Sequence, residues 1–275
     1  MNALETLTAS PASAAAFDGI AESYDRSFTR SLIGRAQRRA VWRELDLLFQ
    51  PGRRILEVNC GTGVDAAHLA ERRIEVLACD AAPRMVALAR RRLAASPFGA
   101  RVEFRTLAIE EVGALAGETP FDGAFSNFGG LNCVEDLPAF AAQLRCLLRP
   151  GAKVLLCLLG PCCAWEVFWS LGHGNLRKAL RRFSLRGTVA DLGNGASVLV
   201  HYPAVRMLAR RFAPGFRLVG WKGVGVTVPP SFVERWAKRH PKVLSFLEGV
   251  DQRVAHLPLL RGLGDHIVVT LERIQ

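Results

Sequence analysis

The sequence predicts an α/β protein in which helices cover both faces of a parallel sheet. Two observations support this prediction. Between residues 54 and 159, short apolar runs alternate with segments in which apolar residues recur at helical spacing. A turn of small residues, 59–63, joins the first apolar run to the first helical segment. Because strands that alternate with helices are joined by crossover connections, we expect their sheet to be parallel.

The first part of the chain is expected to hold a tail, two helices and then the alternating elements. Residues 3–16 consist largely of small side chains and are interpreted as a loosely ordered tail. The two helices lie near 17–33 and 35–49. The expected strands are 54–58, 75–79, 101–105, 122–126 and 153–159, and the expected helices are 64–71, 83–95 and 137–148.

After residue 160 the chain is expected to leave this simple alternation. The predicted elements are helices at 164–171 and 175–186, a strand at 197–202, a helix at 203–212 beginning at Pro203, and strands near 216–226 and 265–272 around a helical insert, 229–262. We therefore expect a tail (1–16) and a core with an N-terminal lid (17–160). The remainder (161–275) would carry cap segments and the last two strands of the same sheet.

The strongest functional signal lies at the ends of the first two predicted strands. The first strand leads into Asn59-Cys60-Gly61-Thr62-Gly63, where small residues let the backbone turn sharply and approach a ligand. The second strand ends at Asp80. A carboxylate at that position can accept both hydroxyl groups of a ribose lying across the strand ends. These residues predict a site for a nucleoside-bearing cofactor.

Glu57 helps to choose between two classes of cofactor. Residues 61–66 also fit the loose dinucleotide pattern G-x-G-x-x-G/A. A dinucleotide would place its pyrophosphate on this loop and on the next helix, and an acid four residues before Gly61 would repel it. An acid is suited instead to a cationic ligand that carries an ammonium group and a sulfonium.

At this point the chain resembles the class I S-adenosylmethionine-dependent methyltransferases, whose first motif reads roughly acid-x-G-C-G-T-G. Glu57 and the residues Cys60 to Gly63 match this motif. Asn59 stands where the family usually has its first glycine, and Asn tolerates a left-handed turn. The resemblance implies a Rossmann-like parallel sheet with an antiparallel last strand, a helical lid and S-adenosylmethionine as the cofactor.

Further segments extend the resemblance over about residues 17–160. They are Asp80–Met85, Phe121–Phe128, Leu148–Leu156 and Phe17–Asp25, the last being similar to ubiquinone-type small-molecule methyltransferases. The resemblance implies that Asp80 takes the ribose, that Met85 packs near adenine and that Tyr24 closes over the cofactor. Many relatives carry an acid after the third strand, where this chain has Leu107-Ala108. The cofactor-binding residues so implied are Glu57, Asn59, Cys60, Gly61, Gly63, Asp80, Ala81, Met85, Leu107, Ala108, Asn127 and Phe128.

Few side chains are candidates for contact with a methyl acceptor. Asn132 sits where relatives often place a polar residue over the transferring methyl group. His173 lies in Gly172-His173-Gly174, which is either a plain turn or a loop that reaches the site. A general base is needed only if the acceptor loses a proton as it attacks. Tyr24, Asn132, His173 and His201 are the candidates.

The seven cysteines are interpreted as buried free thiols, because their number is odd and most lie in apolar runs. Cys162-Cys163 has no second Cys or His pair at ligand spacing, so no metal site is expected.

Charge is divided unevenly along the chain. Residues 161–275 hold 17 Lys and Arg against 7 Asp and Glu, which accounts for +10 of the net charge of +11. The purely structural interpretation is that these basic residues lie on the solvated faces of two helices, at 175–186 and 203–212. The functional interpretations are contact with an anionic membrane surface, attraction of an anionic acceptor, or binding of RNA.

The sequence favours a methyltransferase that acts on a small acceptor, lipophilic, anionic or presented at a membrane. The expected location is cytoplasmic, with peripheral contact to the inner membrane surface as an option, because neither a bilayer-spanning run nor a secretory signal pattern is found. RNA methylation is a second hypothesis, although a recognised basic-aromatic RNA-binding motif is lacking. A non-catalytic cofactor-binding scaffold or regulatory subunit is a third.

Overall fold

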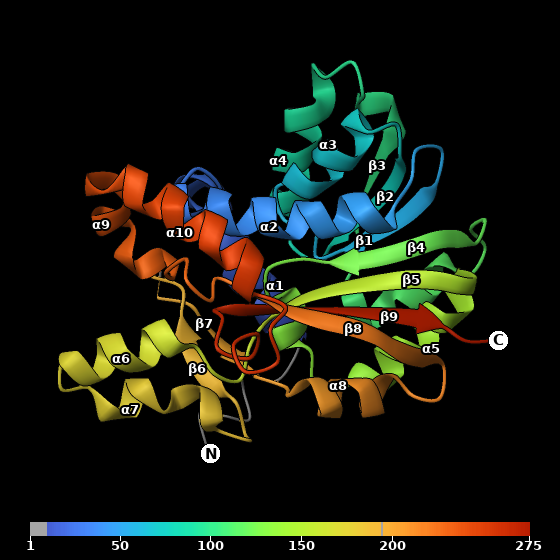
Figure 1. Cartoon of the computed structure of the whole chain (residues 1–275). Helices are drawn as coiled ribbons and strands as arrows, with labels where there is room; N and C mark the ends of the chain where they lie inside the picture. Colours follow the sequence, from blue (N-terminus) through green and yellow to red (C-terminus); the bar gives the residue numbers. More distant parts are fainter. Residues whose placement is uncertain (1–9, 194) are drawn as a thin grey trace.

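A seven-stranded sheet forms the centre of the computed structural model, which describes residues 10–193 and 195–275 (Figure 1). The strand order is β3-β2-β1-β4-β5-β9-β8. The strands are β1 (Arg54–Val58), β2 (Glu75–Asp80), β3 (Val102–Thr106), β4 (Phe121–Ser126), β5 (Leu148–Leu159), β8 (Phe216–Val224) and β9 (His266–Arg273). The strands β1 to β5 run parallel, whereas β9 is antiparallel to both of its neighbours. The predicted parallel sheet with an antiparallel last strand is confirmed.

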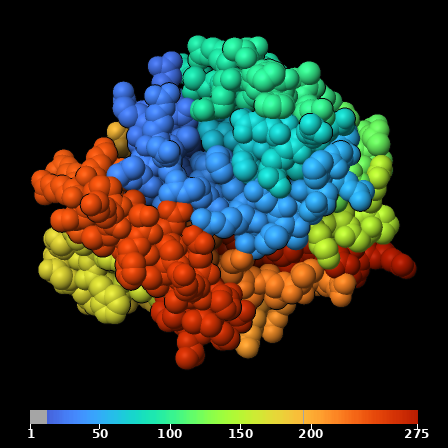
Figure 2. Space-filling view, turned by 45° about the horizontal axis from the view of Figure 1, so that its top comes forward, coloured from blue at the N-terminus to red at the C-terminus, as the bar shows by residue number. Residues whose placement is uncertain are grey.

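Helices cover both faces of this sheet and extend beyond one end of it. The α-helices are α1 (Ser10–Tyr24), α2 (Leu32–Leu48), α3 (Val64–Glu71), α4 (Pro83–Ala94), α5 (Leu137–Leu147), α6 (Ala164–Gly172), α7 (Leu176–Ala179), α8 (Val205–Phe212), α9 (Glu234–Arg239) and α10 (Pro241–Val254). Figure 2 shows α9 and α10 lying on α2, with the chain near α6 emerging below them. In the part of the chain that the structure describes, none of the helices is long and apolar enough to cross a membrane.

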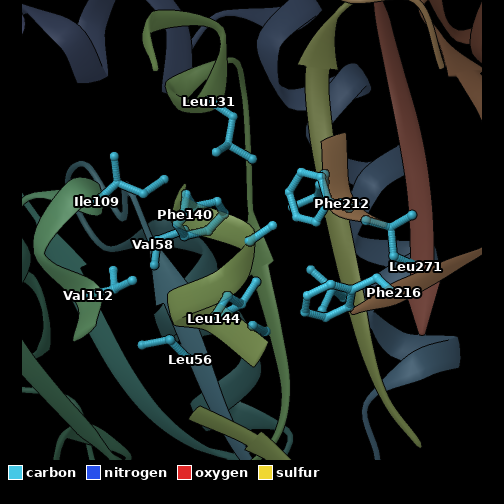
Figure 3. Close-up of a cluster of buried hydrophobic side chains, with 14 of the residues drawn as sticks. Leu56, Val58, Ile109, Val112, Leu131, Phe140, Leu144, Phe212, Phe216 and Leu271 are labelled. Atoms are coloured by element: carbon cyan, nitrogen blue, oxygen red, sulfur yellow. The ribbon is translucent and has the colours of Figure 1, made fainter. Parts of the chain in front are cut away.

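The alternation of side chains along each strand decides which helices they meet. In β1, Leu56 and Val58 join the core under α5, α8 and the 3-10 segment η3 (Ile109–Leu115), whereas Ile55 joins the core under α2, α3 and α4. Both faces of the sheet therefore bury apolar side chains. Figure 3 shows the first core, where the rings of Phe140 (α5) and Phe212 (α8) lie 6.1 Å apart.

A second, two-stranded sheet lies against the N-terminal helix. Its strands are β6 (Thr188–Asp191) and β7 (Ser197–Val200). Val198 and Val200 of β7 are buried in a cluster with Ala16 of α1. The sequence analysis expected β7 but missed β6, which has only four residues and no fully buried side chain to mark it.

The N-terminal region differs from the prediction in two ways. The helix α1 begins at Ser10, before the expected start at residue 17, because alanine-rich segments favour helix and Ala16 packs on β7. The expected single helix over 17–33 is also wrong: a π-helical turn, η1 (Asp25–Thr29), follows Tyr24. The next helix starts at Leu32, where the Ser31 hydroxyl accepts a hydrogen bond from the Gly34 amide at 2.9 Å. Residues 1–9 of the predicted tail lie outside the described residues.

The predicted helix over 175–186 is wrong as well. Only α7 and a short 3-10 turn, η5 (Arg181–Phe183), form there. The reason is that Arg182, expected on a solvated face, turns inward and is only 5% exposed. The helix α8 starts at Val205, so Pro203 precedes it and does not occupy its first turn.

Arg182 lies in a buried ion-pair network that connects α6 and the segment after α7 to the central sheet. Its guanidinium donates to the Asp265 carboxylate at 2.6 Å and pairs with Glu166 of α6 at 2.8 Å. Asp265 also accepts a hydrogen bond from Gln37 of α2 at 3.2 Å. Burial alone would raise the pKa of Asp265, but the charges of His266 and Arg182 hold it below its ordinary value. The cap is therefore fixed to both β9 and α2.

We expect Arg182→Met to lower the free energy of unfolding by about 3–5 kcal/mol, because it leaves Asp265 and Glu166 buried with fewer partners. Arg217→Met is the matched control. Arg217 pairs with Glu272 at the surface with its side chain 65% exposed, and a loss of only about 0–1 kcal/mol is expected. Urea unfolding of both variants measures the difference, and equal losses would contradict the role given to Arg182.

Candidate functional site

The turn after β1 has the backbone conformation that its small residues allow. Asn59, Gly61 and Gly63 all have positive φ, at 59°, 53° and 72°. A Cβ added to Gly61 would meet nothing within 4 Å, whereas one on Gly63 would lie 2.7 Å from the Ala89 Cβ. Gly61 therefore leaves room for a ligand beside the backbone, and Gly63 permits close packing of α4.

Asp80, at the end of β2, accepts a hydrogen bond from this turn. Its Oδ2 accepts a hydrogen bond from the Gly61 amide at 2.8 Å, and its Oδ1 accepts one from the Ala82 amide at 2.9 Å. Burial raises the pKa of Asp80, and these two hydrogen bonds oppose the rise. Each carboxylate oxygen retains capacity to accept a further hydrogen bond from a ligand hydroxyl.

A pocket opens at the carboxyl ends of β1, β2 and β4, beneath α1. Eight of the residues predicted for the site line it: Tyr24, Asn59, Gly61, Asp80, Ala81, Met85, Asn127 and Phe128. The sequence analysis missed the other lining residues, which are Ser13, Ala14, Phe17, Ile109, Glu110, Gly130, Cys133 and Val134. Leu107 and Ala108 line an adjoining cleft that shares Ala14, Ala81 and Glu110 with this pocket.

An acid, Glu110, lines the pocket on the side of β3. It lies two residues after Ala108, where the resemblance to the family places an acid in many relatives. Leu107 and Ala108 stand directly after β3, and Glu110 follows in the first turn of η3 (Ile109–Leu115). The 3-10 turn brings Glu110 to the wall of both the pocket and the adjoining cleft. The sequence analysis considered only Leu107-Ala108 on this side of the pocket and missed Glu110.

Glu57 and Cys60 are buried next to the glycine turn and do not line the pocket. Glu57 is 1% exposed, accepts a backbone hydrogen bond from Ala66 at the start of α3, and leaves its Oε2 without a partner in the described residues. Burial raises the pKa of Glu57 well above its ordinary value, and the nearby charge of Asp65 adds to the rise. Burial likewise raises the pKa of the Cys60 thiol.

Two of the predicted catalytic residues lie outside the pocket wall. Asn132 is fully buried: its Nδ2 donates to the carbonyls of Leu159 (3.1 Å) and His201 (2.6 Å), and its Oδ1 accepts from the Leu159 amide at 2.9 Å. His173 is exposed after α6, where its ring stacks on Trp169 at 4.7 Å. Asn132 therefore joins β5 to the segment after β7, and His173 lies on the exposed surface after α6.

Asp65 organises the site, and sequence reasoning missed it. It lies in the first turn of α3 and is 4% exposed. Its carboxylate accepts hydrogen bonds from Arg38 Nη1 at 2.5 Å, Trp42 Nε1 at 2.6 Å and Asn127 Nδ2 at 3.0 Å. Arg38 also stacks over the Phe128 ring at 4.7 Å. In the sequence, the signal for this hydrogen-bonded cluster is an acid two residues after Gly63, in the first turn of the predicted helix.

The N-terminal segment formed by α1 and η1 (Asp25–Thr29), which was predicted to be a lid, contacts the glycine turn and α4 through charged side chains. Asp25 accepts a hydrogen bond from the Thr62 hydroxyl at 2.6 Å and pairs with Arg92. Asp18 accepts a hydrogen bond from the Arg84 amide at 2.6 Å. Tyr24 directly precedes Asp25, and burial raises its pKa to about 12. The hydroxyl of Tyr24 therefore stays protonated at neutral pH.

Residues 10–193 and 195–275 contain no group of three or more His, Cys, Asp or Glu side chains that could hold a metal ion. The seven cysteines are all free thiols, and those at 60, 79, 157 and 163 are buried.

The sheet order, the positive-φ turn after β1 and the carboxylate at the end of β2 define a protein class, the class I S-adenosylmethionine-dependent methyltransferases. Residues 55–151 match the family model of a methyltransferase domain. The chain from β1 into β5 is therefore a methyltransferase domain of this class.

Individual relatives agree with this class. Demethylmenaquinone methyltransferase of Clavibacter sepedonicus is 34% identical over 148 residues, which cover 52% of this chain and 56% of that protein. The tRNA 5-carboxymethoxyuridine methyltransferase of Escherichia coli K12 is 29% identical over 144 residues, 51% of this chain and 54% of that protein. The chain spans about half the length of these relatives. The solved DhpI–SAH complex covers 96% of this chain and 97% of its own, with a TM-score of 0.59 and 17% identity, a likeness of fold.

The raised pKa of Glu57 gives a testable pH dependence of stability. Because the folded state binds this proton more tightly than the unfolded chain, the stability that Glu57 contributes is complete below the unfolded pKa, near 4.5, and is lost as the pH rises toward the folded pKa. Glu57→Gln has no such proton. Urea unfolding at about pH 5 and about pH 8 should therefore show the variant gaining stability relative to the wild type as the pH rises. A difference that stays constant would contradict this assignment.

Proposed function

We propose that the protein is an enzyme that transfers a methyl group from S-adenosylmethionine to a small acceptor that is lipophilic or presented at a membrane. The observation that carries the proposal is the pocket itself. It places the Gly61 backbone and the Asp80 carboxylate side by side at the strand ends, under a lid that contains Tyr24.

The residues of the pocket fit this cofactor part by part. Asp80 can accept the ribose hydroxyls while it keeps its hydrogen bonds to the turn. Ala81, Met85 and Ile109 offer an apolar slot for the adenine ring, and Glu110 lies beside that slot. The open space at Gly61 admits the remainder of the molecule against the backbone.

The mechanism requires mainly alignment and exclusion of water. When bound, the cofactor supplies an activated methyl group on its sulfonium. The protein holds the acceptor in line with that group, and Phe17 and Tyr24 of the lid close the pocket over it. Neither Tyr24 nor Cys133 is suited to act as a general base, because burial raises the pKa of each to about 12. An acceptor that needs no strong base therefore fits this site best.

The acceptor side of the pocket favours a lipophilic molecule. Phe17, Cys133 and Val134 form this part of the wall, and apolar linings of this kind bind apolar ligands. The demethylmenaquinone methyltransferase among the relatives is named for a quinone substrate. Both observations support a small apolar acceptor.

RNA methylation is the second candidate, because one relative is named for a tRNA substrate. The apolar wall and the internal pairing of Arg182 weigh against it. Labelled S-adenosylmethionine, offered with a cell lipid and small-molecule extract in one assay and with total RNA in another, distinguishes the two. Label in neither fraction, with the cofactor still bound, would favour a binding-only scaffold.

Asp80→Ala should lower the affinity for S-adenosylmethionine by at least about tenfold, because hydrogen bonds to a charged group contribute about 1.5–3 kcal/mol each. Calorimetric titration measures the affinity, and thermal unfolding checks that the variant is folded. NAD serves as the ligand control and should bind neither protein. Unchanged affinity in the variant, or tighter binding of NAD than of S-adenosylmethionine, would overturn the cofactor assignment.

Deleting residues 1–25 should weaken cofactor binding and abolish methyl transfer while the central sheet stays folded. The deletion removes Phe17, Tyr24 and the Asp25 contact to Thr62, so the pocket can no longer exclude water. Deletion of residues 1–9, which leaves α1 in place, is the matched control. Both proteins are compared by label transfer into the extract and by circular dichroism. Normal transfer by the longer deletion would show that α1 is not a lid.

A further inference from the structure

The helices α6 and α7 lie side by side at one end of the molecule and form a hairpin (Figure 1). This hairpin exposes several large apolar side chains. In α6, Glu166 and Ser170 point inward, which leaves Phe168 (73% exposed) and Leu171 on the outer side. After α7, Leu185 is 92% exposed. We define the docking face as the exposed side chains Phe168, Leu171, Leu176, Leu180, Phe183 and Leu185. A patch of this kind on a protein surface marks a site of interaction.

Residues 161–190, which carry the docking face, have exposed arginines and no exposed acid. Arg177 and Arg186 are exposed beside its apolar residues. Glu166 is the only acid between residues 161 and 190, and it is 2% exposed and paired with Arg181 and Arg182. Exposed aromatic and aliphatic side chains flanked by cations match an anionic lipid surface, in which apolar groups insert and cations meet phosphates.

We propose that the docking face binds the surface of an anionic lipid bilayer. This inference rests on the proposed function, since it identifies the surface through which a lipophilic acceptor would reach the enzyme. A second copy of the chain is a poorer occupant, because a symmetric contact would place the arginines of two identical faces against each other.

The docking face is connected to the acceptor pocket through the small sheet. The strand β6 follows the hairpin directly and pairs with β7. Val198 and Val200 of β7 pack with Ala16 and Phe17 of the lid, and Phe17 lines the pocket. The docking face is therefore linked through β6 and β7 to the segment that covers the acceptor.

Vesicle flotation tests the proposal with the full chain. The wild type should bind vesicles of phosphatidylcholine with phosphatidylglycerol, should bind pure phosphatidylcholine vesicles far less, and should lose binding as salt screens the attraction. The double variant Phe168→Gln/Leu185→Gln should weaken binding by about tenfold or more, because two inserting side chains are lost. Leu47→Gln is the matched control, since Leu47 is equally exposed (73%) but lies at the end of α2.

Charge is tested separately from apolar insertion. Arg177→Glu/Arg186→Glu should weaken binding to the same vesicles. Arg91→Glu/Arg101→Glu makes the same change in net charge on the exposed surface near α4 and should keep wild-type binding. If the wild type ignores anionic vesicles at low salt, or if each docking-face variant binds as well as its control, the proposal fails.

Two further measurements separate the alternatives. Sedimentation without lipid reports the oligomeric state, and a dimer abolished by Phe168→Gln/Leu185→Gln would replace the bilayer with a second copy as the occupant. Calorimetric titration with S-adenosylmethionine should give wild-type affinity for every variant named here. Failure of the wild type itself to bind the cofactor would refute the proposed function while leaving the vesicle result to stand separately.

Discussion

The site depends on one buried carboxylate, that of Asp65, which three donors from different parts of the chain share. Arg38 and Trp42 reach it from α2, and Asn127 reaches it from the loop after β4. A carboxylate in this environment is costly unless it is paired and fully hydrogen-bonded, so the three segments are held in one arrangement. That arrangement positions the start of α3, just after the glycine turn, and seats Phe128 against Arg38.

The excess of basic residues after residue 160 has two structural origins. Arg182 is buried and forms an ion pair with Asp265, the residue before β9. Arg181 pairs with the buried Glu166. Arg177 and Arg186 instead remain at the surface, without an ion-pair partner among the described residues. These two groups cannot be distinguished from charge counts, because the sequence does not show which arginine meets a distant acid. Arginines of the second kind, exposed and without an acid partner, are the ones available to an anionic partner.

Features that depend on local pattern could be predicted from the sequence, whereas contacts between distant segments could not. The helix α3 was expected at 64–71 and forms there, because a turn of small residues and helical spacing define both of its ends. Glu110 was missed because only the tertiary path of η3 brings it to the pocket wall. Asn132 occupies a position typical of acceptor-contacting residues, yet here its amide is used entirely by the main chain of β5 and of the segment after β7.

The segment formed by α1 and η1, which we propose as the lid, is held from two sides. On one side Asp25 binds Thr62 and Arg92, and on the other Ala16 packs against Val198 of β7. Opening the pocket must break the polar contacts, and it must also separate α1 from β7 or move β7 with it. Because β7 pairs with β6, which directly follows the α6–α7 hairpin, a hairpin fixed on a bilayer would hold β7 still. The proposed lid would then open against a stationary β7, and the gap would form between α1 and β7.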